Sequence, residues 1–168
     1  MTKVTLRNSD LRQVGNCKEL KAATASSVIE IDLSFNKIDS ANGLDPFTNC
    51  STLILDNNSF SSLKTLPHLA SLMVMSLSNN SLRDCDNSLA QICVCAPKIQ
   101  HLNLIGNPMN PMFSNPAKYE DFRAKVKIWL PTLETLDGTN FTQDQSKIAI
   151  LKVSMEAAKA KALAKIPQ

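Results

Sequence analysis

Hydrophobic residues recur along the chain in one fixed spacing. Four segments fit the pattern LxxLxLxxNxL without gaps, and a weaker copy stands at the N-terminus. The five copies occupy residues 1–11, 28–38, 50–60, 72–82 and 99–109. Within each copy apolar and polar residues alternate, which is the period of a short strand with one buried face. The pattern therefore predicts one strand for each repeat.

The ninth position of each full copy of the pattern is an asparagine. Asn36, Asn58, Asn80 and Asn107 stand 22, 22 and 27 residues apart, and Ser9 takes this place in the first copy. The side chain of asparagine has donors and an acceptor, so it can satisfy the backbone groups of a buried turn. One repeat cannot bury its own leucine face, whereas stacked repeats bury a continuous core. We therefore expect these asparagines to serve structural roles between repeats.

These copies resemble the leucine-rich repeat in its SDS22-like form. The resemblance implies an α/β fold: a right-handed solenoid with a parallel concave sheet of about five to six strands, 3₁₀ or helical turns on the convex side and a helical cap. The chain is also similar to the leucine-rich melanocyte differentiation-associated family, on the segments DLSFN (32–36), LDNN (55–58) and LPHL (66–69). Such proteins act as adaptors, and that family is associated with Rab-type small GTPases and endosome-derived organelles.

Two helices are predicted beyond the strands. The 27-residue step leaves room for a helix over about residues 86–95, with Asp86 as its N-cap. A second helix starts at Asn115, because the following Pro116 suits the first helical position. We expect its apolar face to cover the open end of the last repeat; that face carries Tyr119, Phe122, Val126 and Trp129.

Residues 115–141 are similar to the C-terminal cap of the spliceosomal A-prime protein and of an axonemal dynein light chain. Residues 1–141 are therefore predicted to form one leucine-rich repeat domain with its cap. Residues 142–168 are predicted to add a Lys/Ala-rich helix, capped by Thr142 and ending near Lys165. Its inner face would hold Ile148, Leu151, Met155, Ala158 and Ala162. Three alternatives stay open for its distal part: a solvated helix, a helix that orders on a partner, or a weak binder of anionic surfaces.

Composition disfavours several classes of protein. The 168 residues suit one domain, and the low glycine count of 4 disfavours Rossmann and P-loop enzymes. No apolar run is long enough for a membrane span, and the start MTKVTLRNSD lacks a secretory signal. Five cysteines without a framework are typical of reduced thiols. We therefore expect a cytoplasmic protein that is not secreted, with ciliary or nuclear placement as alternatives.

The net charge of +3 comes from the tail. Residues 1–141 hold 13 basic and 13 acidic residues, whereas residues 142–168 hold five lysines against Asp144 and Glu156. Nucleic-acid affinity needs clustered cations, so direct nucleic acid binding is not expected.

Catalytic chemistry is not predicted. The two histidines, His68 and His101, have no nucleophile and orienting acid placed beside them by the repeat spacing. The cysteine pattern CVC at 93–95 does not match a zinc or redox motif. We therefore expect no catalytic site, no metal and no cofactor.

The remaining candidate is the concave face of the sheet. Apolar side chains on a face that should be wet, surrounded by polar ones, are typical of a binding surface. The predicted protein-binding residues are Glu30, Asp32, Thr52, Ile54, Asp56, Val74, Ser76, Ser78, His101 and Asn103. Lys3 and Arg7 should face the acidic residues of this set. Phe35 is expected either on this face or, as the favoured alternative, in an aromatic spine of the core.

The sequence thus predicts a non-catalytic protein-binding module. The partner would be another protein, offering a helix or a small domain to the concave face, and the chain would be a monomer or a subunit of a hetero-complex. One hypothesis is an adaptor in trafficking or small-GTPase complexes. The alternative is a fixed structural subunit of a large assembly, such as an axoneme or a spliceosomal ribonucleoprotein.

Overall fold

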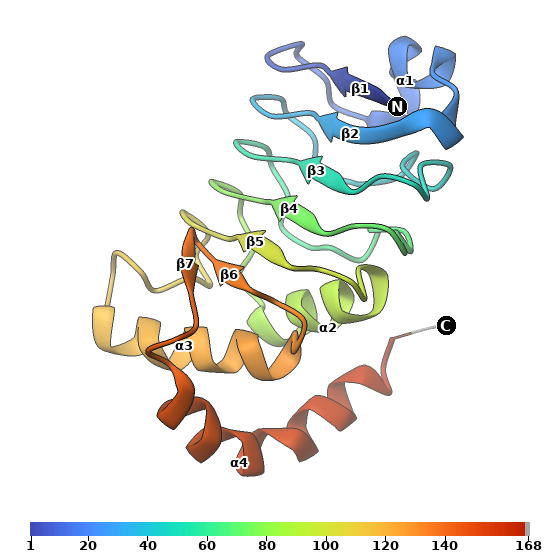
Figure 1. Ribbon diagram of the computed structural model, residues 1–168. Coiled ribbons are helices and arrows are strands. Elements are labelled where there is room, and N and C mark those ends of the chain that lie inside the picture. The colour runs from blue at the N-terminus through green and yellow to red at the C-terminus, as the bar shows by residue number, and fades with distance from the viewer. Residues whose placement is uncertain (167–168) are drawn as a thin grey trace.

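The computed structural model describes residues 1–166 as a stack of repeats that is closed at its C-terminal end by helices (Figure 1). The strands are β1 (Thr2–Thr5), β2 (Val28–Asp32), β3 (Thr52–Ile54), β4 (Val74–Ser76), β5 (His101–Asn103), β6 (Thr135–Leu136) and β7 (Thr139–Asn140). The α-helices are α1 (Lys18–Ala22), α2 (Cys85–Cys95), α3 (Pro116–Trp129) and α4 (Gln145–Leu163), and the 3₁₀ helices are η1 (Val14–Asn16) and η2 (Ala25–Ser27).

All seven strands form one sheet in chain order. β1 to β6 run parallel, and β7 pairs with β6 in the antiparallel direction. The register places Ile31, Leu53, Met75 and Leu102 side by side on the inner face, each at most 2% exposed. The predicted α/β fold with a parallel sheet is confirmed, and the antiparallel β7 is an addition that the repeat pattern did not predict.

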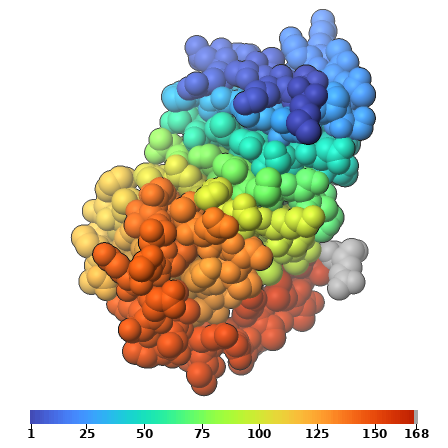
Figure 2. Space-filling view, viewed as in Figure 1, coloured from blue at the N-terminus to red at the C-terminus, as the bar shows by residue number. Residues whose placement is uncertain are grey.

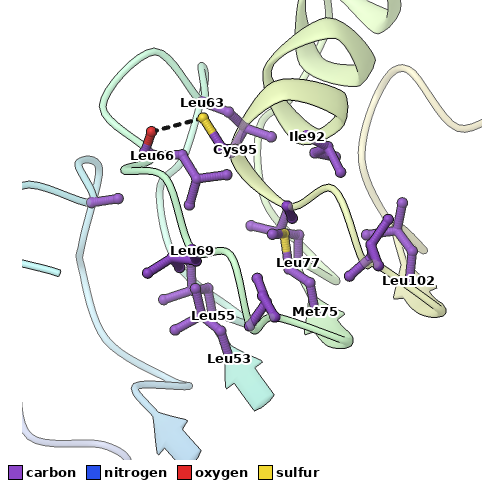
Figure 3. Packing of buried hydrophobic residues seen from close by; sticks show 14 of the residues in the cluster. Leu53, Leu55, Leu63, Leu66, Leu69, Met75, Leu77, Ile92, Cys95 and Leu102 are labelled. Atoms are coloured by element: carbon purple, nitrogen blue, oxygen red, sulfur yellow. Dashed lines mark hydrogen bonds between the residues drawn. The ribbon is translucent and has the colours of Figure 1, made fainter. Parts of the chain in front are cut away.

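One hydrophobic core runs through the repeats. Figure 3 shows its middle, where strand residues such as Leu53 meet leucines of the connecting segments, namely Leu63, Leu66 and Leu69. Helix α2 covers this region, and the Cys95 thiol donates to the Leu66 carbonyl at 3.1 Å. Burying a leucine stabilises the fold by ~1.5–3 kcal/mol. Because each repeat buries leucines of its neighbours, the repeats stabilise one another.

The repeat asparagines hydrogen-bond across successive turns. The Asn58 amide donates to the carbonyls of Leu33, in the preceding repeat, and Leu55, in its own, at 3.0 and 3.1 Å. Its oxygen accepts from the Ile38 N–H at 3.0 Å. Corresponding bonds are made by Asn36, Asn80 and Asn107. The asparagines therefore tie each turn to the one before it.

The residue before each repeat asparagine, and before Ser9 in the first copy, has a left-handed backbone. This row comprises Asn8 (φ 51°), Phe35 (φ 59°), Asn57 (φ 55°), Asn79 (φ 53°) and Gly106 (φ 75°). Glycine and asparagine adopt such angles readily, whereas a bulky side chain pays of the order of 1–3 kcal/mol. The favoured expectation for Phe35 is wrong: the residue is 49% exposed, and its left-handed backbone is the local feature that accompanies this exposure.

Helix α2 occupies the long step before β5, as predicted, but its N-cap differs. Asp84, not Asp86, caps the helix, since its carboxylate accepts from the Asn87 N–H at 3.0 Å. Asp86 lies in the first turn, and its carboxylate pairs with Lys125 of α3 at 2.8 Å. The helix therefore begins two residues earlier than an Asp86 cap would place it, and Asp86 is free to pair across to α3.

Helix α3 covers the end of the core. Asn115 caps it by accepting from the Lys118 N–H at 3.2 Å. Trp129 and Phe122 are 1% and 6% exposed, while Tyr119 is partly exposed and donates its hydroxyl to Asp137 at 2.9 Å. The aromatic face of this helix therefore shields the last repeat from water.

A buried ion pair fixes the segment that enters α4. Arg123 Nη2 lies 2.9 Å from Asp144 Oδ2, and neither side chain is more than 10% exposed. The guanidinium also donates to the Leu136 carbonyl at 3.1 Å. Thr142 is not the N-cap that the sequence predicted: α4 begins later, at Gln145, and the N-cap position is held by Asp144 without a side-chain cap bond. The Asp144 carboxylate is instead used by the arginine.

Helix α4 lies along α3 and extends to α2 (Figure 1). None of its residues is fully buried, and Ala158, expected on the inner face, is exposed. The next residue, Lys159, turns inward and donates to the carbonyls of Ile128 and Trp129 at 3.0 and 2.9 Å. This lysine therefore satisfies the C-terminal end of α3. Within residues 1–166, no helix combines the length and apolarity needed to cross a membrane.

Candidate functional site

The outer face of the sheet carries two straight rows of side chains. The first row runs through Glu30, Thr52, Val74 and His101, and the second through Asp32, Ile54, Ser76 and Asn103. Asp56 and Ser78 lie two residues beyond the ends of β3 and β4. The register brings the eight residues of the two rows onto one face of the sheet, and together with Asp56 and Ser78 we call them the strand face. Two members of this set, Asp32 and Ser78, are buried, each only 9% exposed. Figure 2 shows the repeats stacked in chain order on the side of the molecule seen in Figure 1.

The centre of the strand face is apolar. Ile54 and Val74 come from adjacent strands, and they are diagonal neighbours because Thr52 pairs with Val74 and Ile54 pairs with Ser76. Both side chains keep part of their surface in water. The surrounding residues of both rows are polar, so two aliphatic side chains stand within a polar border.

Two carboxylates border this apolar centre, and each is held by serine. Asp32 Oδ1 accepts from the hydroxyl and the N–H of Ser34 at 2.6 and 2.9 Å. Asp56 Oδ1 accepts from the Ser76 hydroxyl at 2.6 Å and the Ser78 N–H at 2.7 Å. The second oxygen of Asp56 accepts no hydrogen bond from the part of the chain that the structure describes. Asp56 is thus oriented and retains acceptor capacity.

The N-terminal end of the strand face is lined by cations. Lys3 pairs with Glu30 at 2.7 Å, and Arg7 Nε lies 3.7 Å from Asp32 Oδ2. The Arg7 guanidinium carbon also stands 5.3 Å from the centre of the Phe35 ring. The predicted gradient from basic to acidic residues is present for these pairs. Asp56 lies outside it, since no described cation forms an ion pair with it.

The histidines and thiols form no catalytic arrangement among residues 1–166. His101 Nδ1 lies 2.9 Å from the Thr135 hydroxyl, and the exposed His68 lies 3.1 Å from the Val94 carbonyl. No group of three metal-ligating side chains is found in these residues. Burial raises the pKa of the Cys50 and Cys85 thiols to about 11, so neither is an activated nucleophile at neutral pH.

One hollow lies in the cap, away from the strand face. It measures about 720 Å³ and sits between α3, β7 and the start of α4, with Arg123, Asp144 and Lys147 in its wall. Arg123 and Asp144 are already paired with each other, and Lys147 pairs with Glu120 at 3.1 Å and with Asp121. The charges of this hollow are therefore used within the cap.

Two residues beside the strand face were not among the predicted binding residues. The sequence pattern gives Arg7 only the role of a counter-charge, and for Phe35 it favours the core with the strand face as the alternative. The sequence did contain a signal for the unusual place of Phe35. The corresponding residues of the other repeats, Asn8, Asn57, Asn79 and Gly106, are of types that favour left-handed backbone angles, and phenylalanine is the exception. Ser78 shows a second feature that sequence cannot give, because its buried hydroxyl has no hydrogen-bond partner among the described residues.

Comparison with known proteins agrees with the repeat architecture. No protein-family profile matches the chain. The acidic leucine-rich nuclear phosphoprotein 32 family member A of Drosophila pseudoobscura pseudoobscura is 28% identical over 148 residues, covering 77% of this chain and 55% of the relative. Its Drosophila melanogaster counterpart is 28% identical over 146 residues, covering 76% and 54%. The chain thus spans about half the length of these curated relatives.

A solved structure shows the same fold. A chain in the crystal structure of the Drosophila melanogaster SNF/U2A' complex superimposes with a TM-score of 0.65, at 19% identity. The superposition covers 96% of this chain and 86% of that chain, so it includes the repeats and the helical cap together. The fold shared with that chain therefore extends over nearly all of this chain.

Proposed function

We propose that this leucine-rich repeat protein is a non-catalytic interaction module that binds a partner protein through its strand face. The observation that carries the proposal is the apolar pair Ile54 and Val74, set among polar residues on an open sheet. Apolar side chains in this position do not contribute to the core, which lies on the other side of the sheet. Their burial by a partner would remove apolar surface from water, which favours association.

The polar border adds specificity to this apolar contact. Asp56 is fixed by two hydrogen bonds and keeps an oxygen free within the described structure. A fixed acceptor recognises a basic or N–H group of a partner with little loss of side-chain freedom. The small side chains of Thr52 and Ser76 would let a helix or a small domain approach the sheet closely. We therefore assign the predicted set from Glu30 to Asn103 to partner binding.

The cellular role has two candidates. The first is an adaptor in trafficking or small-GTPase complexes, which rests on the resemblance to the SDS22-like and melanocyte differentiation-associated proteins. The second is a fixed subunit of an assembly such as a spliceosomal ribonucleoprotein, and the likeness to a chain of the SNF/U2A' complex favours it. Residues 1–141 would form the binding module, and 142–168 would brace its end. The adaptor would act in the cytoplasm, and the spliceosomal subunit in the nucleus.

The decisive experiment places a photo-reactive benzoylphenylalanine at position 54 and, as a control, at the exposed Lys64 of a connecting segment. A partner captured from position 54 alone is identified by mass spectrometry, purified and titrated against the wild-type chain. The double variant Ile54→Lys, Val74→Lys should bind it at least tenfold more weakly, with an unchanged melting temperature. Equal capture at both positions, or unaltered affinity of the variant, would refute the assignment.

The same titration separates the two roles. Purified Drosophila melanogaster SNF is the probe for the assembly role, and binding that is lost in the double lysine variant would support it. Retained binding of SNF to that variant would place the contact elsewhere. A chain that is monomeric and stable without a partner favours the adaptor, whereas a permanent subunit should be poorly soluble when alone.

A further inference from the structure

Phe35 occupies a position that its side chain does not suit. It has a left-handed backbone with φ 59°, whereas the corresponding residues of the other repeats are asparagine or glycine. Asparagine tolerates this conformation better than phenylalanine does, because its short polar side chain can bond locally. The strain therefore lies in one repeat, the one next to the N-terminal end of the strand face.

The phenylalanine ring is not part of the hydrophobic core. Its side chain is 49% exposed, while the core residues Leu33 and Ile38 near it are fully buried. The left-handed backbone is a cost for folding, and the exposed half of the side chain recovers none of it by leaving water. Backbone strain of this kind persists at functional positions, such as those that clamp a ligand.

Arg7 completes the feature. Its guanidinium carbon lies 5.3 Å from the centre of the Phe35 ring, which holds a cation over an aromatic face. The nearest carboxylate is Asp32, whose Oδ2 is 3.7 Å from Arg7 Nε and whose Oδ1 already accepts from Ser34. The Arg7 side chain is 56% exposed, and its terminal nitrogens donate no hydrogen bond to the described residues. They remain available to a carboxylate, which a guanidinium binds through two parallel hydrogen bonds.

This pair adjoins the strand face. The Phe35 N–H donates to the Asp56 carbonyl at 2.9 Å, so the backbone of Phe35 is joined to that of a binding residue. Arginine is among the residue types most enriched where binding energy is concentrated, and phenylalanine is enriched at protein interfaces.

We propose that Phe35 and Arg7 form the anchor of the binding surface, and that they receive a partner segment carrying a carboxylate beside a large aliphatic or aromatic side chain. The apolar group packs on the exposed Phe35 ring, and the carboxylate accepts from the terminal nitrogens of Arg7. This inference rests on the proposed function, because the anchor extends the strand face. It further assigns the strain of Phe35 to binding rather than to folding.

The test uses the full chain and a phage library of random 16-residue peptides as the probe. Peptides selected on the wild-type chain should share an acidic residue next to Leu, Ile, Met or an aromatic residue. Phe35→Asn should bind these peptides at least tenfold more weakly, and Arg7→Gln should weaken acidic peptides more than their Asp→Asn or Glu→Gln analogues. Phe35→Asn should also raise the folding equilibrium constant about fivefold, since asparagine relieves the strain.

The control is Asn57→Phe, which places the same side chain one repeat further along the row. It should lower stability, because it introduces the strain again, and leave peptide affinity within twofold. A destabilised Phe35→Asn variant would show that the ring supports the fold, and unchanged peptide binding would show that it is no anchor. Either result overturns the proposal.

The same peptides distinguish a failure of the anchor from a failure of the proposed function. If the selected peptides are lost in the Ile54→Lys, Val74→Lys variant but bind Phe35→Asn normally, the strand face binds and the anchor is wrong. If selection enriches no peptide, or only peptides that neither variant affects, both proposals are overturned. Enriched peptides with basic instead of acidic residues would refute the role of Arg7.

Discussion

Replacement of Asn80 by alanine tests how the repeats are held together. The Asn80 amide donates to three carbonyls, those of Leu55, Leu77 and Ser78. Each of these carbonyls has a second partner: the Asn58 amide at 3.1 Å, the Asn107 amide at 2.8 Å and the Asn57 N–H at 2.8 Å, respectively. No carbonyl is therefore left without a hydrogen bond when the asparagine is removed.

The cost instead comes from the Phe60 N–H. It donates to Asn80 Oδ1 at 3.0 Å, and Phe60 is 0% exposed, so water cannot replace the lost acceptor. An unpaired buried group of this kind costs ~1–3 kcal/mol. Loss of the buried side chain adds about 1 kcal/mol through the space it leaves. We expect Asn80→Ala to lower the free energy of unfolding by about 2–4 kcal/mol.

Asn36→Ala provides the informative contrast. Asn36 Oδ1 accepts from two N–H groups, those of Ser9 and Leu11, both at 3.0 Å. Ser9 is exposed and Leu11 is partly exposed, so water can take over as the acceptor. We expect a loss of only about 1–2 kcal/mol, although one more N–H group is affected.

Urea denaturation, followed by circular dichroism, measures both values as shifts of the midpoint at constant slope. Asn79→Gly is the matched control, since glycine retains the left-handed conformation of that exposed residue, and it should change stability by less than about 1 kcal/mol. A loss for Asn36→Ala equal to or larger than that for Asn80→Ala would refute the reasoning, because the number of bonds rather than their burial would then decide.

Three further outcomes are expected. Arg123→Gln should cost about 3–5 kcal/mol in urea denaturation, because it leaves a buried carboxylate without its cation. The exposed ion-pair variant Lys147→Gln should shift the urea midpoint far less. Burial and a nearby carboxylate raise the pKa of Tyr119 to about 12. Absorbance at 295 nm should therefore show this single tyrosine ionising near pH 12. The free energy of unfolding contributed by the neutral tyrosine should be complete below pH 10 and lost as the pH rises towards 12. Ionisation near pH 10 in the folded chain would contradict this. Lys159→Gln should speed amide hydrogen exchange in the distal half of α4, since the bonds to the end of α3 are lost, whereas the exposed-lysine variant Lys161→Gln should not.

The repeat pattern predicted the sheet because its constraints are local and periodic. A strand with one buried face needs alternating residues, and residues such as Leu53 and Met75 recur at the same place in every copy. Stacking then sets the register, because a shift of one residue would turn these side chains outward. The chemistry of the turns follows similarly from the polar groups of asparagine.

What sequence could not give depends on contacts between distant segments. The sequence pointed to Asp86 as the cap of α2, whereas the structure uses Asp84 there and pairs Asp86 with Lys125 of α3. Asp144 looks like a first-turn acid of α4 until Arg123 is seen to hold it. Phe35 is of a residue type that usually lies in the core, yet it is half exposed and has a left-handed backbone that its side chain does not favour. The candidate binding face was assembled from periodicity, but its Arg7 and Phe35 border required the structure.

The reversal of direction at β7 determines where this molecule can change its length. A parallel stack of repeats contains nothing that limits its size, since each unit offers its neighbour the same edge. Here β7 pairs antiparallel to β6 and leads away into α4, so growth at that end is blocked. Duplication of one 22-residue unit between Asn58 and Asn80 would instead leave both ends intact and add one strand in the middle. Evolution and protein engineering can therefore lengthen the outer face one strand at a time without rebuilding the cap.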